Sequence, residues 1–352
     1  MHKIPVTVIT GFLGAGKTTL VRRLLQENHG RRIAVLVNEF GEVGIDGELL
    51  RDCQICDDAT AERSERDRPD ILELANGCLC CTVQEEFLPT MQELLKRREQ
   101  LDCILIETSG LALPKPLVQA FRWPEIRTGA TVDGVVTVVD GAALAEGQMV
   151  GDLDALQAQR QADDSLEHET PIEELFEDQL ACADIVLLTK TELLSDKQRD
   201  RVLTWLKQAV PSGVKIIPCQ QGQISPDVLL GFNAAVEDNL DQRPSHHDHE
   251  EDHEHDDHIT SICVDLPQAF DPKALVAQLQ RLVAHHDIYR IKGFVTVPNK
   301  PMRLVLQGVG ARFDYFYDRP WQPDERRTTR LVFIGDQLDS AAIHQAIAAP
   351  SP

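Results

Sequence analysis

The sequence predicts an α/β domain built on a mainly parallel sheet, followed by a smaller α+β domain. Three observations support this division. Strand-like apolar runs alternate with helical segments over the first two-thirds of the 352 residues, a glycine-rich loop separates the first strand from the first helix, and a polar segment at 237–258 precedes a region with a different rhythm. Repeated strand–helix units indicate parallel strands covered on both faces, with ligands at their carboxyl ends.

The glycine-rich loop follows the apolar run Ile4–Ile9, which we expect to be the first strand, and precedes a helix expected from Thr18 to about Glu27. It matches every fixed position of the phosphate-binding loop (P-loop), in which backbone N–H groups surround phosphates, Lys17 reaches the outer oxygens and the Thr18 hydroxyl binds Mg²⁺. The alternative is a chance glycine-rich turn. The candidate nucleotide-binding residues here are Gly11, Phe12, Leu13, Gly14, Ala15, Gly16, Lys17, Thr18 and Thr19.

The other elements of the first domain are predicted from apolar periodicity and capping signals. We expect the charged stretch Asp52–Pro69 to be a surface insertion and the acidic stretch Gly147–Glu169 to be an excursion from the core. Thr170 is then expected to cap a helix, with Pro171 at its first position and Glu173 completing a capping box. The expected strands are Ile33–Val37, Cys103–Ile106, Val132–Val139, Ile185–Leu188 and Lys215–Ile217, and the expected helices are Glu85–Arg98, one from Pro171 to about Cys182, and Gln198–Ala209.

The last third of the chain has mixed α+β patterning. We therefore expect a first domain at 1–236, a linker rich in His and acidic residues at 237–258 and a second domain at 259–352. In the second domain the expected strands are Ile259–Val264, Tyr289–Val297, Arg303–Gln307 and Arg330–Ile334, and the expected helix lies near Pro272–Ala284.

Composition narrows the class of protein. A formal net charge of −22 argues against nucleic acid as a partner and favours cations or basic proteins. No apolar run reaches the roughly 18 to 20 residues that a membrane span needs, so we expect no membrane insertion and a cytoplasmic protein. Nine cysteines, three of them within four positions, fit a reducing compartment in which thiols bind metals.

A second nucleotide motif is expected at the end of the strand that precedes Glu107. Glu107 is expected to act near Mg²⁺, directly or through water, and the Gly110 N–H to sense the terminal phosphate. Lys17 and Glu107 are thus the candidate catalytic residues. The alternative is a core strand that ends in an incidental glutamate.

The choice of base is expected to depend on the segment after the strand Ile185–Leu188. Thr189 and Lys190 fit the guanine-reading pattern Asn/Thr-Lys-x-Asp, and Glu192 occupies its fourth position. Glu192 keeps the carboxylate that accepts two hydrogen bonds from guanine, but it adds a methylene group. GTP is favoured over ATP, and weaker guanine selectivity is the alternative.

The loop after the second strand is where a switch loop would lie. Its carboxylates, Glu39 and Glu42 among them, have three possible roles: holding Mg²⁺, orienting water or completing the ligand shell of a transition metal. The alternative is a solvated acidic loop.

A cluster of cysteines is the second distinctive feature. Cys78, Cys80 and Cys81 can supply two or three thiolate ligands to a tetrahedral Zn²⁺ or Co²⁺ site, and a fourth ligand must come from elsewhere. The alternative is a set of buried structural cysteines. Cys53 and Cys56 also have metal-ligand spacing, but they lack a second pair, so we do not assign them to a metal.

Between His246 and His258 the linker alternates six histidines with seven carboxylates, a composition that collects divalent metals without one fixed geometry. The alternative is a solvated acidic spacer. The candidate metal-gathering residues are His246, His247, His249, His253, His255 and His258.

The P-loop, the Cys-x-Cys-Cys cluster and the His-rich linker together resemble the CobW family of GTP-dependent metallochaperones. The resemblance runs nearly end to end, and it is strongest to the member associated with aerobic cobalamin biosynthesis. It extends to the segments Glu107–Pro114, Pro171–Leu180 and Lys300–Trp321. It implies a GTPase domain with a CobW C-terminal domain, GTP hydrolysis with Mg²⁺, and delivery of cobalt to a client protein, the cobaltochelatase. Glu192 departs from the family's usual Asp.

The sequence leaves rival functions open. One is a zinc, iron or nickel chaperone of the same fold, because the cysteines do not encode one ion. The other is a non-enzymatic metal buffer with a decayed nucleotide site, which the intact Gly16-Lys17-Thr18 argues against. The sequence does not reveal the oligomeric state.

Overall fold

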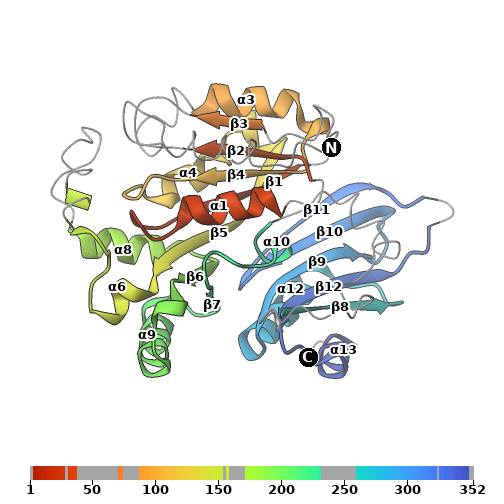
Figure 1. Ribbon diagram of the computed structural model, residues 1–352. Coiled ribbons are helices and arrows are strands. Elements are labelled where there is room, and N and C mark those ends of the chain that lie inside the picture. Colours follow the sequence, from red (N-terminus) through yellow and green to blue (C-terminus); the bar gives the residue numbers. More distant parts are fainter. Residues whose placement is uncertain are drawn as a thin grey trace, which may run out of the picture. The chain divides into compact units, whose positions relative to one another are not determined.

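The computed structural model describes residues 3–27, 31–37, 70–73, 87–153, 156–157, 171–230, 259–322 and 325–348. Its contacts divide the chain into an N-terminal unit (Lys3–Gly231) and a C-terminal unit that begins at Phe232. Figure 1 shows the elements of each unit. Each unit has its own sheet and its own core, so we describe each by itself.

The N-terminal unit contains a seven-stranded sheet in which every strand pairing is parallel. β1 lies at its centre between β4 and β5, with Ile9 opposite Glu107 on one side and Val136 on the other. In sheet order, the strands are β3 (Asp70–Glu73), β2 (Ile33–Val37), β4 (Cys103–Glu107), β1 (Ile4–Thr10), β5 (Ala130–Asp140), β6 (Ile185–Thr189) and β7 (Lys215–Pro218).

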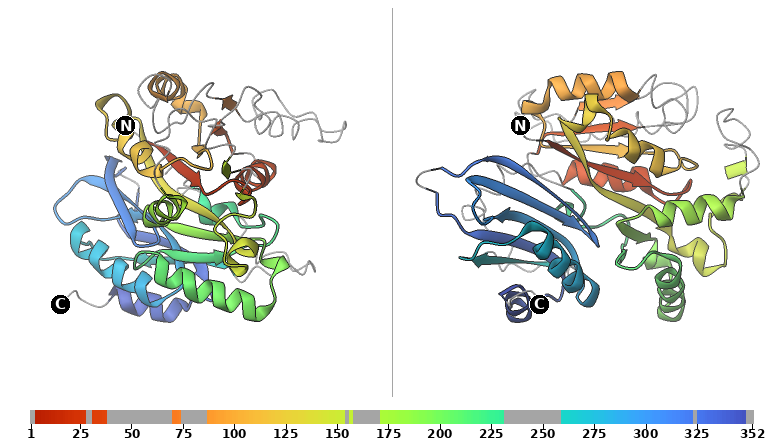
Figure 2. Two further views of the ribbon diagram at one scale, coloured as in Figure 1. Left: turned by 90° about the vertical axis from the view of Figure 1, so that its left-hand side faces the viewer. Right: turned by 180° about the vertical axis from the view of Figure 1, so that it is seen from behind.

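Helices cover both faces of this sheet, and Figure 2 shows α1 on one face and α4 on the other. The core beneath α3, α4 and α5 is formed by Val6, Val8, Met91, Ile104 and Leu117, among others. The helices of the unit are α1 (Lys17–Gln26), α3 (Leu88–Lys96), η3 (Arg98–Gln100), α4 (Pro114–Ala120), α5 (Pro124–Arg127), α6 (Gly141–Ala145), α8 (Ile172–Ala181), η4 (Thr191–Leu193), α9 (Asp196–Ala209) and α10 (Pro226–Leu229).

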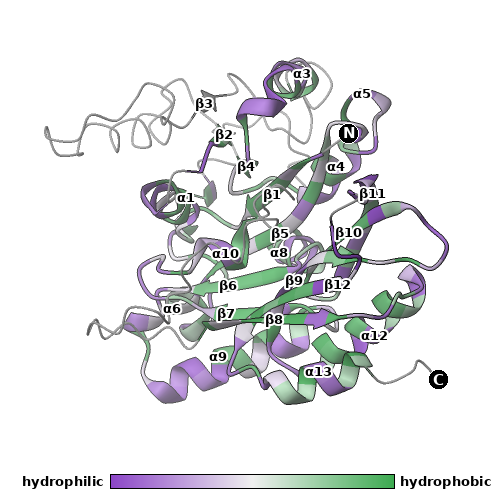
Figure 3. Ribbon diagram, turned by 90° about the vertical axis from the view of Figure 1, so that its right-hand side faces the viewer, coloured by the Kyte–Doolittle hydropathy of each residue, from purple (hydrophilic) through white to green (hydrophobic). Residues whose placement is uncertain are grey.

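A second core in the same unit lies under α6, α8 and α9, and it includes Phe12 of the P-loop. Apolar side chains of β6 and α9 meet there, whereas the other side of α9 is hydrophilic (Figure 3). This two-sided pattern is expected for a helix that packs on a sheet with one face only.

The C-terminal unit contains a five-stranded antiparallel sheet with its own core. Helices α12 (Pro272–His285) and α13 (Ser340–Ala348) contribute to that core through Leu279 and Ile343. In sheet order, the strands are β11 (Arg312–Pro320), β10 (Met302–Val309), β9 (Ile288–Val295), β12 (Thr329–Asp336) and β8 (Ile259–Leu266).

The predicted fold class, a mainly parallel α/β domain followed by an α+β domain, is confirmed. Several boundaries were wrong. The helix predicted at Glu85–Arg98 is α3 followed by the short η3, and the helix predicted at Gln198–Ala209 begins at Asp196. Its start is capped by Ser195, whose N–H donates to the Gln198 side chain over 3.1 Å.

The predicted start of α8 was also wrong. Pro171 is the N-cap with extended backbone (ψ 146°), so the helix begins at Ile172, and no side chain among the described residues caps it. Glu173 therefore lies too early in the helix to complete a capping box. Thr170 lies outside the described residues.

Candidate functional site

The P-loop connects β1 to α1 through three glycines with positive φ: Gly11 (136°), Gly14 (75°) and Gly16 (102°). A Cβ atom at Gly11 would lie 2.1 Å from the Val138 carbonyl oxygen of the neighbouring strand. Only glycine is therefore compatible with this backbone path. Within the described residues no side chain caps α1, and its first turn carries no acidic residue, so the N-terminus of α1 is suited to an anion.

Lys17, Thr18 and Glu107 converge beside this loop. The Lys17 ammonium donates to the Phe12 carbonyl oxygen over 3.2 Å, and the Thr18 hydroxyl donates to Glu107 Oε1 over 2.7 Å. Glu107 is 3% exposed and comes from the strand adjacent to β1. A hydroxyl and a carboxylate that meet beside a phosphate loop are the oxygen ligands that Mg²⁺ uses with nucleotides.

Two further hydroxyls lie at the same edge of the sheet. Thr10 and Thr108 are buried, and neither hydroxyl has a hydrogen-bond partner among the described residues. Buried polar groups are normally satisfied by protein or water. These hydroxyls therefore fit a hydrated cation or a phosphate at this edge, and the sequence analysis had not singled them out.

The segment expected to choose the base is tied to the P-loop. The Thr189 hydroxyl lies 2.7 Å from the Ala15 carbonyl oxygen and 3.0 Å from the Val139 carbonyl oxygen. Lys190 has a left-handed backbone (φ 57°), and its ammonium pairs with Asp140 at 2.5 Å.

Asp140 is a site residue that the sequence analysis missed. One of its carboxylate oxygens pairs with Lys190 and the other accepts from the backbone N–H groups of Ala142 and Ala143 at the start of α6. Its place at the end of a strand next to β6 was the available signal. Lys190 is thereby held by a carboxylate 50 residues earlier in the chain.

The carboxylate of Glu192 is exposed and accepts from the Gln221 N–H at 3.4 Å. Gln221 belongs to the turn between β7 and α10, which also contacts Thr191: the Thr191 hydroxyl donates to the Cys219 carbonyl oxygen over 3.0 Å. The additional methylene group of Glu192, relative to Asp, thus extends the carboxylate toward this turn.

Cys219 in the same turn should be chemically inert in the folded protein. Burial raises the pKa of its thiol to about 12, and the thiol donates to the Gln223 carbonyl oxygen over 3.2 Å. We expect its alkylation by iodoacetamide at pH 8 to be roughly 10³-fold slower than that of exposed Cys263, because only thiolates react. Mass spectrometry of the two peptides measures both rates, and in urea they should become similar. Equal rates in the native protein would contradict the burial of Cys219.

Every candidate ligand for a transition metal lies outside the described residues. No group of three or more His, Cys, Asp or Glu side chains arranged to hold a metal ion occurs among the residues that the structure describes. The candidates are Glu39, Glu42, Cys78, Cys80, Cys81, His246, His247, His249, His253, His255 and His258, and the unassigned Cys53 and Cys56 also lie outside the described residues.

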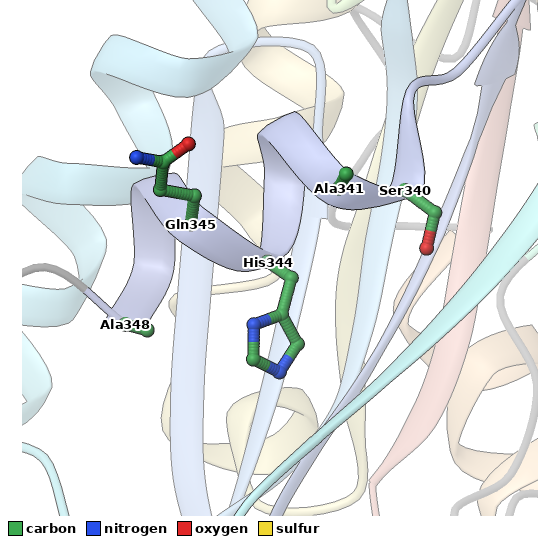
Figure 4. A pocket seen from close by; sticks show the side chains of 5 residues that line it. All are labelled: Ser340, Ala341, His344, Gln345 and Ala348. Atoms are coloured by element: carbon green, nitrogen blue, oxygen red, sulfur yellow. The ribbon is translucent and has the colours of Figure 1, made fainter.

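A hollow on α13 in the C-terminal unit lacks the features of a nucleotide site (Figure 4). All of its lining residues come from that one helix, and they include neither a glycine-rich turn nor a lysine or arginine that would hold a phosphate. They are Ser340, Ala341, His344, Gln345 and Ala348.

Within the described part of the chain, no helix has the length and apolar character that a membrane crossing requires.

Comparisons with known proteins identify the family of the chain. Residues 5–218 match the model of the family described as CobW/HypB/UreG, nucleotide-binding domain, and residues 259–350 match the cobalamin synthesis protein cobW C-terminal domain. The chain is 56% identical to a protein of Pseudomonas aeruginosa named zinc chaperone CobW, over 97% of this chain and 90% of that protein. It is 32% identical to Escherichia coli zinc chaperone YjiA, over 99% of each.

A solved structure, that of the Zn(II)-bound YjiA GTPase from E. coli, is 28% identical and covers 99% of both chains, with a TM-score of 0.43. The family assignment depends on the sequence matches, which span both units and include the P-loop. The chain therefore belongs to the CobW/HypB/UreG family of nucleotide-binding proteins, with a P-loop domain of the GTPase type and a CobW-type C-terminal domain.

Proposed function

We propose that this protein is a GTP-hydrolysing metallochaperone in which the nucleotide state controls a metal site at Cys78, Cys80 and Cys81. The observation that carries the proposal is the hydrogen bond of 2.7 Å between Thr18 of the P-loop and buried Glu107, in a chain that also contains the Cys-x-Cys-Cys cluster. The cysteine cluster lies between these two nucleotide motifs in the sequence. Changes at the nucleotide are proposed to reach the cysteines through the chain that joins the cluster to these two motifs.

Each nucleotide-site residue has a role in this proposal. The backbone N–H groups of the P-loop hold the phosphates, and Lys17 donates to the outer phosphate oxygens as charge develops there. Thr18 and Glu107 hold Mg²⁺, which supplies neutralising charge to the phosphates when bound. The Gly110 N–H contacts the terminal phosphate. When this phosphate leaves after hydrolysis, the contact is lost and the loop after β4 is released.

Glu192 is proposed to select guanine, since it presents a carboxylate beyond β6. Replacing Glu192 with Ala should lower the preference for GTP over ATP by roughly 10- to 150-fold, because a hydrogen bond to a charged group contributes about 1.5–3 kcal/mol. Calorimetric titration with each nucleotide measures the ratio of the two Kd values. Glu177→Ala removes the same charge from an exposed position on α8 and is the matched control. An unchanged ratio in Glu192→Ala would show that the base is read elsewhere.

The cargo is proposed to be a divalent ion suited to thiolates, Zn²⁺ or Co²⁺. Zinc is favoured by the names of the relatives from P. aeruginosa and E. coli. Cobalt delivered to a cobaltochelatase is the alternative, and it comes from the resemblance to the cobalamin-linked member.

Glu39 and Glu42 complete or regulate the site, and the histidines of the linker at 237–258 gather metal for it. A cytoplasmic location and the domains at 1–236 and 259–352 are parts of the same proposal.

The test is a titration of Co²⁺ into the reduced full-length protein with Mg²⁺ and GTP, GDP or no nucleotide, followed by thiolate charge-transfer and d–d absorption. We expect Co²⁺ to bind tightly with tetrahedral bands in the presence of GTP and more weakly in the presence of GDP. In the proposal GTP favours the conformation that binds the metal, and a ligand shifts a conformational equilibrium only by its differential affinity for the two states. Competition with Zn²⁺ in the same titration ranks the two ions.

Replacing Cys80 and Cys81 with Ser should abolish this nucleotide dependence and leave GTP affinity unchanged. Deleting residues 246–258 should leave the tight site intact and remove only weak additional binding. Nucleotide-independent binding that disappears with residues 246–258 would instead identify a metal buffer.

A further inference from the structure

Helix α8 contacts both nucleotide loops of the N-terminal unit through two residues, Phe176 and Gln179, that are separated by three positions. Residues with this spacing lie on the same face of a helix. Phe176 packs on Phe12 of the P-loop, and Gln179 bonds to the segment just after Glu107. A helix that only covers the sheet would not need to contact either loop.

The polar contact is made by Gln179, whose side chain is fully buried. Its amide nitrogen donates to the Gly110 carbonyl oxygen over 3.2 Å and to the Ala112 carbonyl oxygen over 3.1 Å. The Gln179 backbone is itself fixed, because its carbonyl accepts from the Thr137 hydroxyl of β5 over 3.0 Å. One buried side chain therefore joins the central sheet to the loop after β4.

The apolar contact reinforces this connection. The Phe12 and Phe176 rings lie 5.5 Å apart, and both belong to the same buried cluster as Leu111. Leu111 lies between the two residues whose carbonyls Gln179 holds. The P-loop and the loop after β4 are thus fastened to one turn of α8.

The chemistry of an amide suits a group that holds a moving loop. Gln179 uses its donor atoms in the contacts above, and its acceptor Oε1 has no hydrogen-bond partner among the described residues. An amide can both donate and accept. Gln179 can therefore donate to carbonyl oxygens of the loop in one state and accept from a backbone N–H of the loop in another. A buried acceptor without a hydrogen-bond partner destabilises the state in which it occurs. A second state in which Oε1 accepts a hydrogen bond would remove that penalty.

We propose that Gln179 is a positioning residue that holds the Gly110 segment for GTP hydrolysis and transmits the movement of this segment to α8. The inference rests on the proposed GTPase function and adds a regulatory connection to the same site. The state of the terminal phosphate changes the Gly110 segment, and Gln179 conveys that change to the helix.

The experiment compares Gln179→Met with a matched control, Gln278→Met, in the full-length protein. Gln278 of α12 is also buried, and its amide nitrogen likewise donates to two backbone carbonyl oxygens, those of Ala346 (2.5 Å) and Ile347 (3.2 Å). Both changes remove a similar pair of hydrogen bonds, but only one of them touches the nucleotide loops.

We expect kcat for GTP hydrolysis to fall about tenfold in Gln179→Met, with KM and the Kd for GDP changed less than about threefold, because misplacement of a reacting loop affects chemistry more than binding. The control should keep kcat within about twofold of the wild type. A kcat in Gln179→Met no lower than that in Gln278→Met would overturn the proposal.

Hydrogen exchange on the wild type tests the same connection without a variant and therefore covers the case in which Gln179→Met does not fold. A non-hydrolysable GTP analogue should slow exchange in both Glu107–Pro114 and α8 relative to GDP. Protection of the loop without any change in α8 would refute transmission. Absence of GTP hydrolysis by the wild type would refute the proposed function itself, which keeps the two failures distinct.

Discussion

Replacing Lys17 with Ala is expected to lower kcat for GTP hydrolysis by roughly 10²–10³-fold, the usual cost of losing one preorganised donor to developing charge. Lys17 is only 7% exposed, and its ammonium is held at the loop by the Phe12 carbonyl oxygen. The charge is therefore already in place before the nucleotide binds. Steady-state hydrolysis with saturating Mg²⁺ and GTP measures the effect.

Lys197→Ala is the matched control because it removes the same charge from an exposed position on α9. The control should hydrolyse GTP at the wild-type rate. Retention of more than about a tenth of the activity by Lys17→Ala would be inconsistent with a P-loop mechanism.

Replacing Arg303 with Met is expected to destabilise the C-terminal unit by about 3–5 kcal/mol, because it leaves carboxylates without their buried partner. Arg303 is 2% exposed, pairs with Asp318 at 2.5 Å and with Glu325 at 3.3 Å, and lies 3.7 Å from the centre of the Phe294 ring. Burial raises the pKa of Glu325, but hydrogen bonds from Arg319 and the Gln322 N–H, together with the nearby arginine charges, lower it below the ordinary value of a glutamate.

For a unit of this size, such a loss should lower Tm by at least about 10 °C, as measured by calorimetry on the full-length protein. The control is Arg330→Met, which breaks an exposed pair with Asp265 (3.0 Å) and should cost less than about 1 kcal/mol. Replacing Asp318 together with Arg303 by apolar residues should recover part of the loss. Equal shifts in the Arg303 and Arg330 variants would show that burial of the pair has no energetic consequence.

The sequence predicted the elements whose signals are local. The first strand, the P-loop and α1 follow from one apolar run, three glycines and a helical pattern within about 25 residues, and the structure confirms them within one residue. β11 was missed because Arg312–Pro320 mixes charged and aromatic residues, as suits a strand at the edge of a sheet. β3 was missed because it follows a long charged stretch and has only four residues.

The parts of the site that escaped prediction depend on tertiary contacts. Asp140 meets Lys190 only because β5 and β6 are neighbours, and Gln179 reaches the Gly110 segment across 69 positions of sequence. Neither residue belongs to a recognisable motif of its own. Lys17, Thr18 and Glu107 could be named as candidates in advance because each type is required by phosphate or Mg²⁺ chemistry, and the structure brings Thr18 and Glu107 together; their roles stay predictions.

The hydrogen bond between the Thr189 hydroxyl and Ala15 has a consequence for biosynthesis. The two residues are 174 positions apart. The P-loop follows the carboxyl end of β1, and β1 is paired in the sheet only after β4 and β5 have also been made. At about 5–20 residues per second, a ribosome takes roughly 9 to 35 s to make the intervening chain. The P-loop therefore leaves the ribosome long before its supporting contacts exist, and a nascent chain shorter than about 190 residues should be unable to retain GTP.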